Sequence, residues 1–168
     1  MPLPPLLALP LEATPLFLIE HAARALFDRL LAVHPGLFDR LGEHGGKRYA
    51  FSPTDLPLHF LVIPAARRLT VSRRASPPEA DAALSGPLAL LLGLMEGRLD
   101  GDALFFARDL TASGDMEAIL ALRNALDDSA IDLPEDLGAI AGPLAPVARR
   151  LAREIRSRAL DGRTPSWN

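Results

Sequence analysis

The sequence predicts an α/β (α+β) domain in which a mostly antiparallel sheet packs against strongly apolar helices. Three stretches carry this prediction. Residues 110–126 join an alternating segment to a helical one, residues 48–74 alternate in short runs broken by turns, and residues 88–96 are apolar nearly all round. Period-two alternation is typical of half-buried strands, whereas apolar positions three and four residues apart are typical of a helix face.

The stretch 110–126 is predicted to form a strand, a tight turn and a helix. Apolar and small residues at 110, 112 and 114 alternate with hydroxyl residues, and from Ile119 the apolar positions follow a helical spacing. Gly114 can turn the chain at low steric cost, and Asp115 is a good helix N-cap. A phosphate at this helix start is the alternative, but Asp115 would repel an anion, so capping is favoured.

Further strands and helices are expected along the rest of the chain. A first helix should follow Thr14 as its cap and Pro15 in its first turn, and a second short helix is expected near Phe38. The apolar helix 88–96 should be buried, because it is far too short to span a bilayer. Four strands are expected at residues 48–52, 56–63, 68–74 and 80–85. Turns are expected between them, because these runs are separated by Pro, Asp and Ser.

Composition excludes several classes of function. The chain of 168 residues has a net charge of −3, which argues against a nucleic-acid partner. It contains no cysteine, so disulfides, thiolate catalysis and cysteine-bound metals are excluded. Its four histidines are scattered, and the Gly-rich loop around Lys47 lacks the spacing of a phosphate-binding loop. No catalytic residue, cofactor or metal site is therefore predicted.

Both ends of the chain are expected to extend beyond a domain spanning residues 15–130. Residues 1–14 form an apolar, proline-rich arm that packs either on the domain or against lipid. Residues 131–168 are predicted to be a helical extension with a basic amphipathic helix, which either docks on the core or attaches to an anionic membrane. The arginines assigned to membrane contact are Arg149, Arg150, Arg153 and Arg156.

Three motifs resemble the sterol carrier protein type 2 family of lipid-binding domains. They are the run from Ala80 to Gly86, the sequence Gly97-Arg98-Leu99-Asp100 and the run from Leu110 to Asp115. The resemblance covers about residues 15–128. Within this family, residues 104–117 and 124–127 are most similar to bacterial accessory factors of oxygen-independent ubiquinone biosynthesis.

The resemblance implies a five-stranded, mostly antiparallel sheet covered by helices around an apolar tunnel. It also implies a non-catalytic protein that carries prenylated ubiquinone precursors, quinones or phospholipid. The implied protein partners are the iron–sulfur hydroxylase pair of that pathway. The implied location is the cytoplasm, with peripheral contact at the inner membrane.

Candidate residues for the wall of this lipid site are large apolar residues of the predicted helices and strands. For each of them alone, packing in an ordinary core is as good an explanation as ligand contact. An alternative function is a protein-interaction scaffold for lipid-modifying enzymes without a bound lipid; an enzyme on small acyl substrates is a third hypothesis, for which no catalytic residue can be named. The candidates are Phe17, Phe27, Leu31, Phe60, Val62, Leu91, Leu92, Met95, Phe105, Phe106, Ile119 and Leu122.

Overall fold

The computed structural model describes residues 14–97, 109–129 and 131–140, together with residues 150, 153 and 157. The apolar arm, except for Thr14, lies outside the described residues, as does most of the basic C-terminal helix. The predicted lipid contacts Phe105 and Phe106 also lie outside them, and so do the predicted membrane contacts Arg149 and Arg156.

A single five-stranded sheet forms the centre of the described structure. Its strand order is β3-β2-β1-β4-β5, with antiparallel pairing everywhere except between β1 and β4, which are parallel. This confirms the predicted five-stranded, mostly antiparallel sheet. The strands are β1 (Tyr49–Pro53), β2 (His59–Ile63), β3 (Arg68–Ser72), β4 (Ala82–Gly86) and β5 (Thr111–Gly114).

The register places large apolar side chains on one face of the sheet. Phe51 of β1 is paired with Phe60 of β2 on one side and with Leu84 of β4 on the other. Because side chains alternate along a strand, paired residues share a face. The opposite face is more polar: beside two larger apolar residues of β2 it carries Ser52 and His59, whose Oγ and Nδ1 atoms lie 2.9 Å apart.

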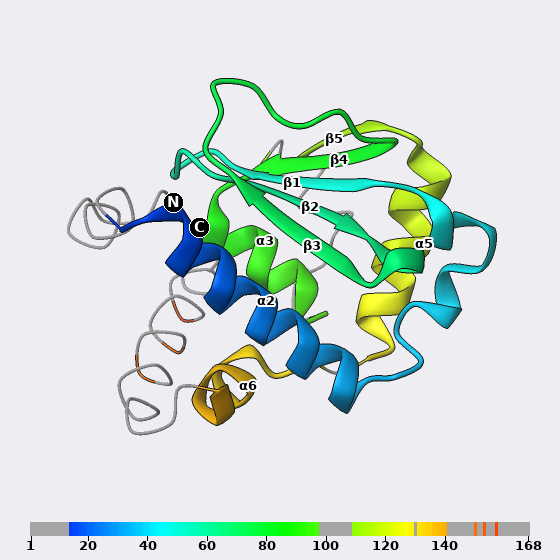
Figure 1. Cartoon of the computed structure of the whole chain (residues 1–168). Coiled ribbons are helices and arrows are strands. Elements are labelled where there is room, and N and C mark those ends of the chain that lie inside the picture. The colour runs from blue at the N-terminus through cyan, green and yellow to red at the C-terminus, as the bar shows by residue number, and fades with distance from the viewer. Residues whose placement is uncertain are drawn as a thin grey trace, which may run out of the picture.

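The helices α2, α3 and α5 pack on the apolar face, as Figure 1 shows. In α3, five of the eight residues are buried, which confirms the prediction of a buried helix at residues 88–96. Within the described part of the chain, no helix combines the length and the apolar character that a membrane crossing needs. The helices are α2 (Leu16–Val33), the 3₁₀ helices η1 (Asp39–Gly46) and η2 (Pro64–Ala66), α3 (Leu88–Met95), α5 (Met116–Asp127) and α6 (Leu133–Ile140).

Two local predictions need correction, and one helix is placed more exactly. Pro15 itself occupies the N-cap of α2 and no side chain caps the helix, so the prediction of Thr14 as its cap was wrong by one residue. The Gly-rich loop expected around Lys47 lies largely within η1, where Gly42 with φ of +54° kinks two 3₁₀ turns and Lys47 is the C-cap. Helix α6 lies within the predicted helical extension, for which no individual bounds were predicted; its first turn is held by Asp132, whose Oδ1 accepts a hydrogen bond from the Glu135 N–H at 3.3 Å.

The predicted turn between β5 and α5 is confirmed in detail. The Asp115 carboxylate caps α5 by accepting a hydrogen bond from the Ala118 N–H at 3.0 Å. Its other oxygen pairs with the Lys47 ammonium group. Gly114 has φ of +85°, and a Cβ there would lie 2.3 Å from the carbonyl oxygen of Asp81, so glycine is required. The hydrogen bond from Lys47, followed by the Ala118 N–H, lowers the pKa of Asp115 from 3.8 to about 2.

We expect Asp115→Asn to remove part of the acid sensitivity of this domain. Asparagine caps a helix about as well as aspartate, but it cannot titrate. Because folding lowers the pKa of Asp115, its carboxylate stabilises the native state above the unfolded-state pKa, and this stability is lost as the pH falls toward 2. The difference in free energy of unfolding between wild type and variant should therefore be largest above about pH 4, near the unfolded-state pKa.

Urea unfolding at a series of pH values checks this prediction. The matched variant Lys47→Gln removes the other partner of the ion pair. In this background, the difference in free energy of unfolding caused by Asp115→Asn should change less with pH. A constant difference between wild type and Asp115→Asn across the acid range would contradict the prediction.

Candidate functional site

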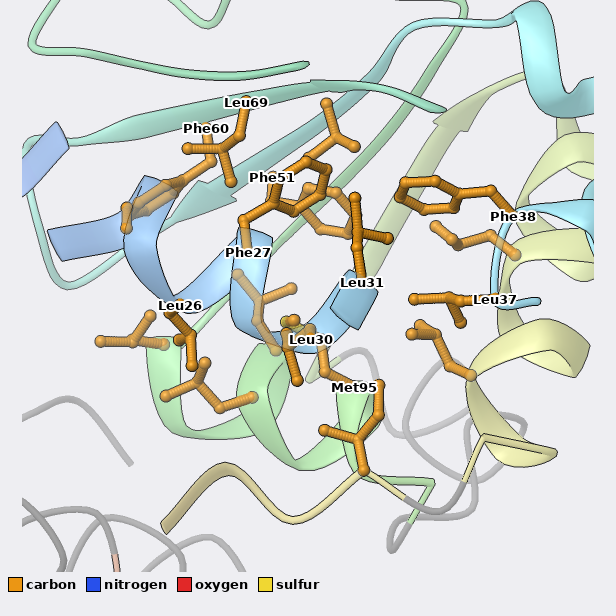
Figure 2. Close-up of a pocket in the computed structure, with 18 of the residues that line it drawn as sticks. Leu26, Phe27, Leu30, Leu31, Leu37, Phe38, Phe51, Phe60, Leu69 and Met95 are labelled. Carbon is orange, nitrogen blue, oxygen red and sulfur yellow. The ribbon is translucent and has the colours of Figure 1, made fainter. Parts of the chain in front are cut away.

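The apolar face of the sheet and the helices form the walls of a partly open cavity of about 160 Å³. Every side chain that lines it is a hydrocarbon apart from the thioether of Met95. Figure 2 shows the labelled ones distributed between the strands, α2 and α3. An apolar cavity of about 150 Å³ stays dry and can hold a molecule of the size of benzene. This cavity is therefore suited to hydrocarbon and not to water.

The sheet wall of the cavity comes from three neighbouring strands. Phe51 and Pro53 of β1, Phe60 and Val62 of β2 and Leu69 of β3 line it. They face the same side because they alternate along their own strands and pair across the sheet, as Val62 does with Leu69. The position of each of these side chains is thus fixed by the ladder of backbone hydrogen bonds.

The helix wall comes mainly from α2 and α3, which lie across the sheet. In α2 and in α3 the lining residues repeat at a helical spacing, so each helix turns one side toward the cavity. Most are aliphatic residues without polar atoms, so they supply shape and no hydrogen bond. The residues are Ala23, Leu26, Phe27, Leu30 and Leu31 of α2, and Leu88, Leu91, Leu92 and Met95 of α3.

The end of the cavity near α5 is closed by residues from loops and from a third helix. Leu37 and Phe38 follow α2, Leu122 and Leu126 belong to α5, and Ile131 precedes α6. The ring of Phe38 lies against that of Phe27, with centroids 5.8 Å apart and planes tilted by 41°. Such a tilted pair is a favourable arrangement of two aromatic quadrupoles, so it holds the loop over the end of the cavity.

Eight of the twelve residues predicted as lipid contacts line this one cavity: Phe27, Leu31, Phe60, Val62, Leu91, Leu92, Met95 and Leu122. Phe17 does not, because Leu16 and Ile19 occupy the inward side of α2 near its start and Phe17 is turned outward with 68% of its surface exposed. Ile119 is buried in the core but does not line the cavity.

Several lining residues were missed in the sequence, and only some of them had a usable signal. The period of two within their own strands would have grouped Phe51 with Tyr49 and Leu69 with Val71. The helical spacing of the apolar stripe in α2 would have added Leu26 and Leu30, which stand four residues apart. In contrast, the residues in irregular segments have no periodicity from which to place them. These are Leu37, Phe38 and Ile131.

Charged groups near the cavity hold its frame and do not enter it. Glu96, only 7% exposed at the end of α3, accepts a hydrogen bond from the Leu133 N–H at 3.0 Å and so ties α6 to α3. Asp136 of α6 lies 3.5 Å from the Nε of Arg29 on α2. Among the described residues, no group of three His, Cys, Asp or Glu side chains is placed to hold a metal ion. The cavity lining itself offers neither an acid nor a base nor a nucleophile.

The family is decided by residues 27–127, which match the model of the SCP-2 sterol transfer family and make up more than half of the chain. The chain belongs to the SCP-2 sterol transfer family. The matched residues begin at Phe27 in α2 and end at Asp127 in α5, so they include most of the cavity wall.

Several solved structures are similar to this chain. A "UbiJ-SCP2 Ubiquinone synthesis protein" is 19% identical, with a TM-score of 0.50, and the match covers 79% of this chain and 98% of that one. The sterol carrier protein domain 2 of Helicoverpa armigera is 15% identical, with a TM-score of 0.45 and coverage of 64% and 91%. Sterol Carrier Protein 2 from Yarrowia lipolytica, in its apo form, is 14% identical, with a TM-score of 0.44 and coverage of 63% and 90%. A search of curated proteins gives no significant match.

A cavity-enlarging variant should become dependent on added hydrocarbon. Leu30 is 3% exposed and lines the cavity, so Leu30→Ala should lower the free energy of unfolding by about 2–5 kcal/mol. Cyclohexane should restore part of this stability, because a ligand that binds only the native state stabilises it. Urea unfolding with and without cyclohexane measures both effects.

The matched control is Leu58→Ala. Leu58 is 1% exposed in a second apolar cluster with Leu56 and Val71 and does not line the cavity. This variant should lose stability without recovery in cyclohexane. Equal recovery of both variants would mean that the hydrocarbon acts on the domain as a whole and not through the cavity.

Proposed function

We propose that this chain is a non-catalytic lipid carrier that takes up prenylated ubiquinone precursors or quinones and presents their rings to modifying enzymes. The observation that carries the proposal is the wholly apolar cavity between α2, α3 and the sheet. Membership of the SCP-2 sterol transfer family and the likeness in fold to a UbiJ-SCP2 ubiquinone synthesis protein support it.

The chemistry of the wall supports binding of the tail inside and the ring outside. Each methylene removed from water contributes about 0.8 kcal/mol, so an isoprenoid tail gains strongly on entering a dry cavity. A hydroxyl or carbonyl of the ring would find no hydrogen-bond partner among the lining side chains, which costs roughly 1–3 kcal/mol per group. The ring therefore stays at the mouth, where an enzyme can reach it.

The size of the cavity limits how much of a tail it holds. A volume of about 160 Å³ suits a short hydrocarbon segment and not a long polyprenyl chain. A longer tail requires side chains to move, and the partly buried Leu31, Leu92 and Met95 are suited to this because they pack at the edge of the core. Methionine in particular adapts its three rotatable bonds to irregular shapes.

In this proposal the protein works in the cytoplasm with peripheral contact at the inner membrane, where the precursors reside. Its enzymatic partners are the iron–sulfur hydroxylase pair of oxygen-independent ubiquinone synthesis. The carrier itself contributes no catalytic group, in keeping with a cavity lined by hydrocarbon.

Filling the cavity with an indole should abolish the function while leaving the fold intact. Met95→Trp adds a large ring at the partly buried edge of the lining, where the neighbours can yield. Native mass spectrometry of protein purified from its own host should show prenylphenol, quinone or phospholipid on the wild type and none on the variant. Cells that carry only the variant should contain less ubiquinone than cells that carry the wild type.

The control is Leu120→Trp, which adds the same ring on the surface of α5, where Leu120 is 54% exposed. It should keep both lipid and function. If Met95→Trp instead supports normal ubiquinone synthesis while folded and empty, the chain acts as a scaffold without a bound lipid and the carrier proposal is wrong.

A further inference from the structure

The outer side of α5 presents two apolar side chains to solvent. Met116 is 56% exposed and Leu120 is 54% exposed, and they stand four residues apart on one side of the helix. The opposite side carries the buried residues of α5, which pack on α3 and β4. Exposed apolar residues are common on protein surfaces, so the charges around this pair decide what the outer side of α5 can meet.

Carboxylates surround the exposed apolar pair of α5. The hydrogen bond to Asp115 raises the pKa of Lys47, and the nearby carboxylates of Glu117 and Glu43 raise it further, so three carboxylates crowd one ammonium group. In all, six carboxylates on or capping η1 and α5 stand against three basic side chains, and this surface is therefore net negative. The carboxylates are Asp39, Glu43, Asp115, Glu117, Asp127 and Asp128, and the bases are Arg40, Lys47 and Arg123.

The C-terminal segment of the chain has the complementary charge. Residues 141–168 contain six arginines and two carboxylates. In the basic helix predicted there, Val147, Leu151 and Ile155 stand four residues apart, the same spacing as the exposed apolar pair of α5. Arg150, the first described residue of this segment, is exposed. An apolar stripe flanked by arginines is complementary to an apolar pair flanked by carboxylates.

The point at which this segment leaves the domain favours a second copy of the chain as its partner. Helix α6, which ends at Ile140, packs on α2 and is held there by Asp136, which lies 3.5 Å from the Arg29 Nε. Figure 1 shows α6 on the α2 side of the molecule, apart from α5. The chain between Ile140 and Val147 spans at most roughly 25 Å. This length lets the basic segment extend away from its own domain to a neighbouring one.

We propose that this chain forms a twofold dimer in which the basic C-terminal segment of each copy docks on the outer side of the other copy's α5, around Met116 and Leu120. The contact is made twice, so the assembly closes. The segment has two predicted uses, docking on a core or attachment to an anionic membrane, and the dimer takes the first, with the core supplied by the second copy. The contact does not depend on what the cavity carries, because α5 lines the cavity with its opposite side, at Leu122 and Leu126.

Sedimentation velocity of the full chain tests the charges of this contact. The wild type should be a dimer at low salt and should dissociate as salt screens the exposed charges. Glu43→Arg with Glu117→Arg should weaken dimerisation roughly 30-fold, because it places like charges opposite one another in both contacts of the dimer. Arg150→Glu with Arg156→Glu should do the same from the other side. An equimolar mixture of these two double variants should dimerise again, since each reversed surface then meets its complement.

The matched control reverses two carboxylates away from α5. Asp28→Arg with Glu79→Arg makes the same change in net charge on α2 and on the loop before β4, and should leave the dimer intact. Met116→Gln changes no charge and should weaken the dimer at least roughly 5-fold, because the contact loses an apolar side chain. Urea unfolding shows whether each variant is folded.

Two results would overturn the proposal. One is a wild type that stays monomeric at low salt, which is the result expected if the segment docks on its own chain, binds a different protein or attaches to a membrane. The other is a mixture of the two folded, charge-reversed variants that does not dimerise.

Cross-linking tests which segments meet. The chain contains no cysteine, so a bismaleimide joins only introduced cysteines. Copies with Met116→Cys, mixed with tagged copies carrying Leu151→Cys, should give a covalent mixed dimer with a short bismaleimide. Ser76→Cys, on an exposed loop, should give none in place of Met116→Cys. Equal cross-linking from positions 116 and 76 would contradict the proposed contact. Native mass spectrometry should find the same lipid on all of these variants, so failure of the dimer and failure of the carrier function are separate results.

Discussion

Apolar packing between one face of the sheet and the helices laid across it is the interaction on which the rest of this structure depends. Buried residues of α3, α5, η1 and the inner strand positions form one continuous core, which also includes Ile131 and Leu133 beyond α5. Around most of this interface the side chains fill the space between the layers. Between α2, α3 and the central strands they do not, and the space left there is the cavity.

The polar contacts of the domain serve this packing from its edges. Asp115 and Lys47 fix the start of α5 against the chain that enters β1, and Glu96 fixes α6 to the end of α3. Arg48 donates to Asp81, the residue before β4, and so holds the parallel pair β1 and β4 in place. Because all of these groups lie outside the cavity, its interior stays free of hydrogen-bonding groups. A site of this kind recognises its ligand by shape and apolar area. Selectivity for the polar ring then depends on the protein that contacts the ring at the mouth of the cavity.

The two sides of α2 lie in different surroundings. The inner side of α2 lines the cavity, while Phe17 on its outer side is exposed, near the point where Arg73 donates to the carbonyl of Thr14. A lipid that leaves a bilayer for the cavity crosses less water if the helix that separates the two is itself at the membrane surface. The cost of exposing a hydrocarbon chain to water, about 0.8 kcal/mol per methylene, is the physical reason why such proximity matters.

The sequence by itself determined the elements whose signal is local. Period-two runs gave all five strands to within a few residues, Gly114 and Asp115 gave the turn into α5, and the uniform hydrophobicity of residues 88–96 gave a buried helix. The three family motifs were enough to indicate the fold that the family model then supported. Only the tertiary structure decided that Phe17 faces outward and that Leu37, Phe38 and Ile131 close the cavity. The reason is that periodicity tells which side of an element is apolar, whereas the packing of elements distant in sequence decides which apolar side chains meet one another and which are left facing a gap.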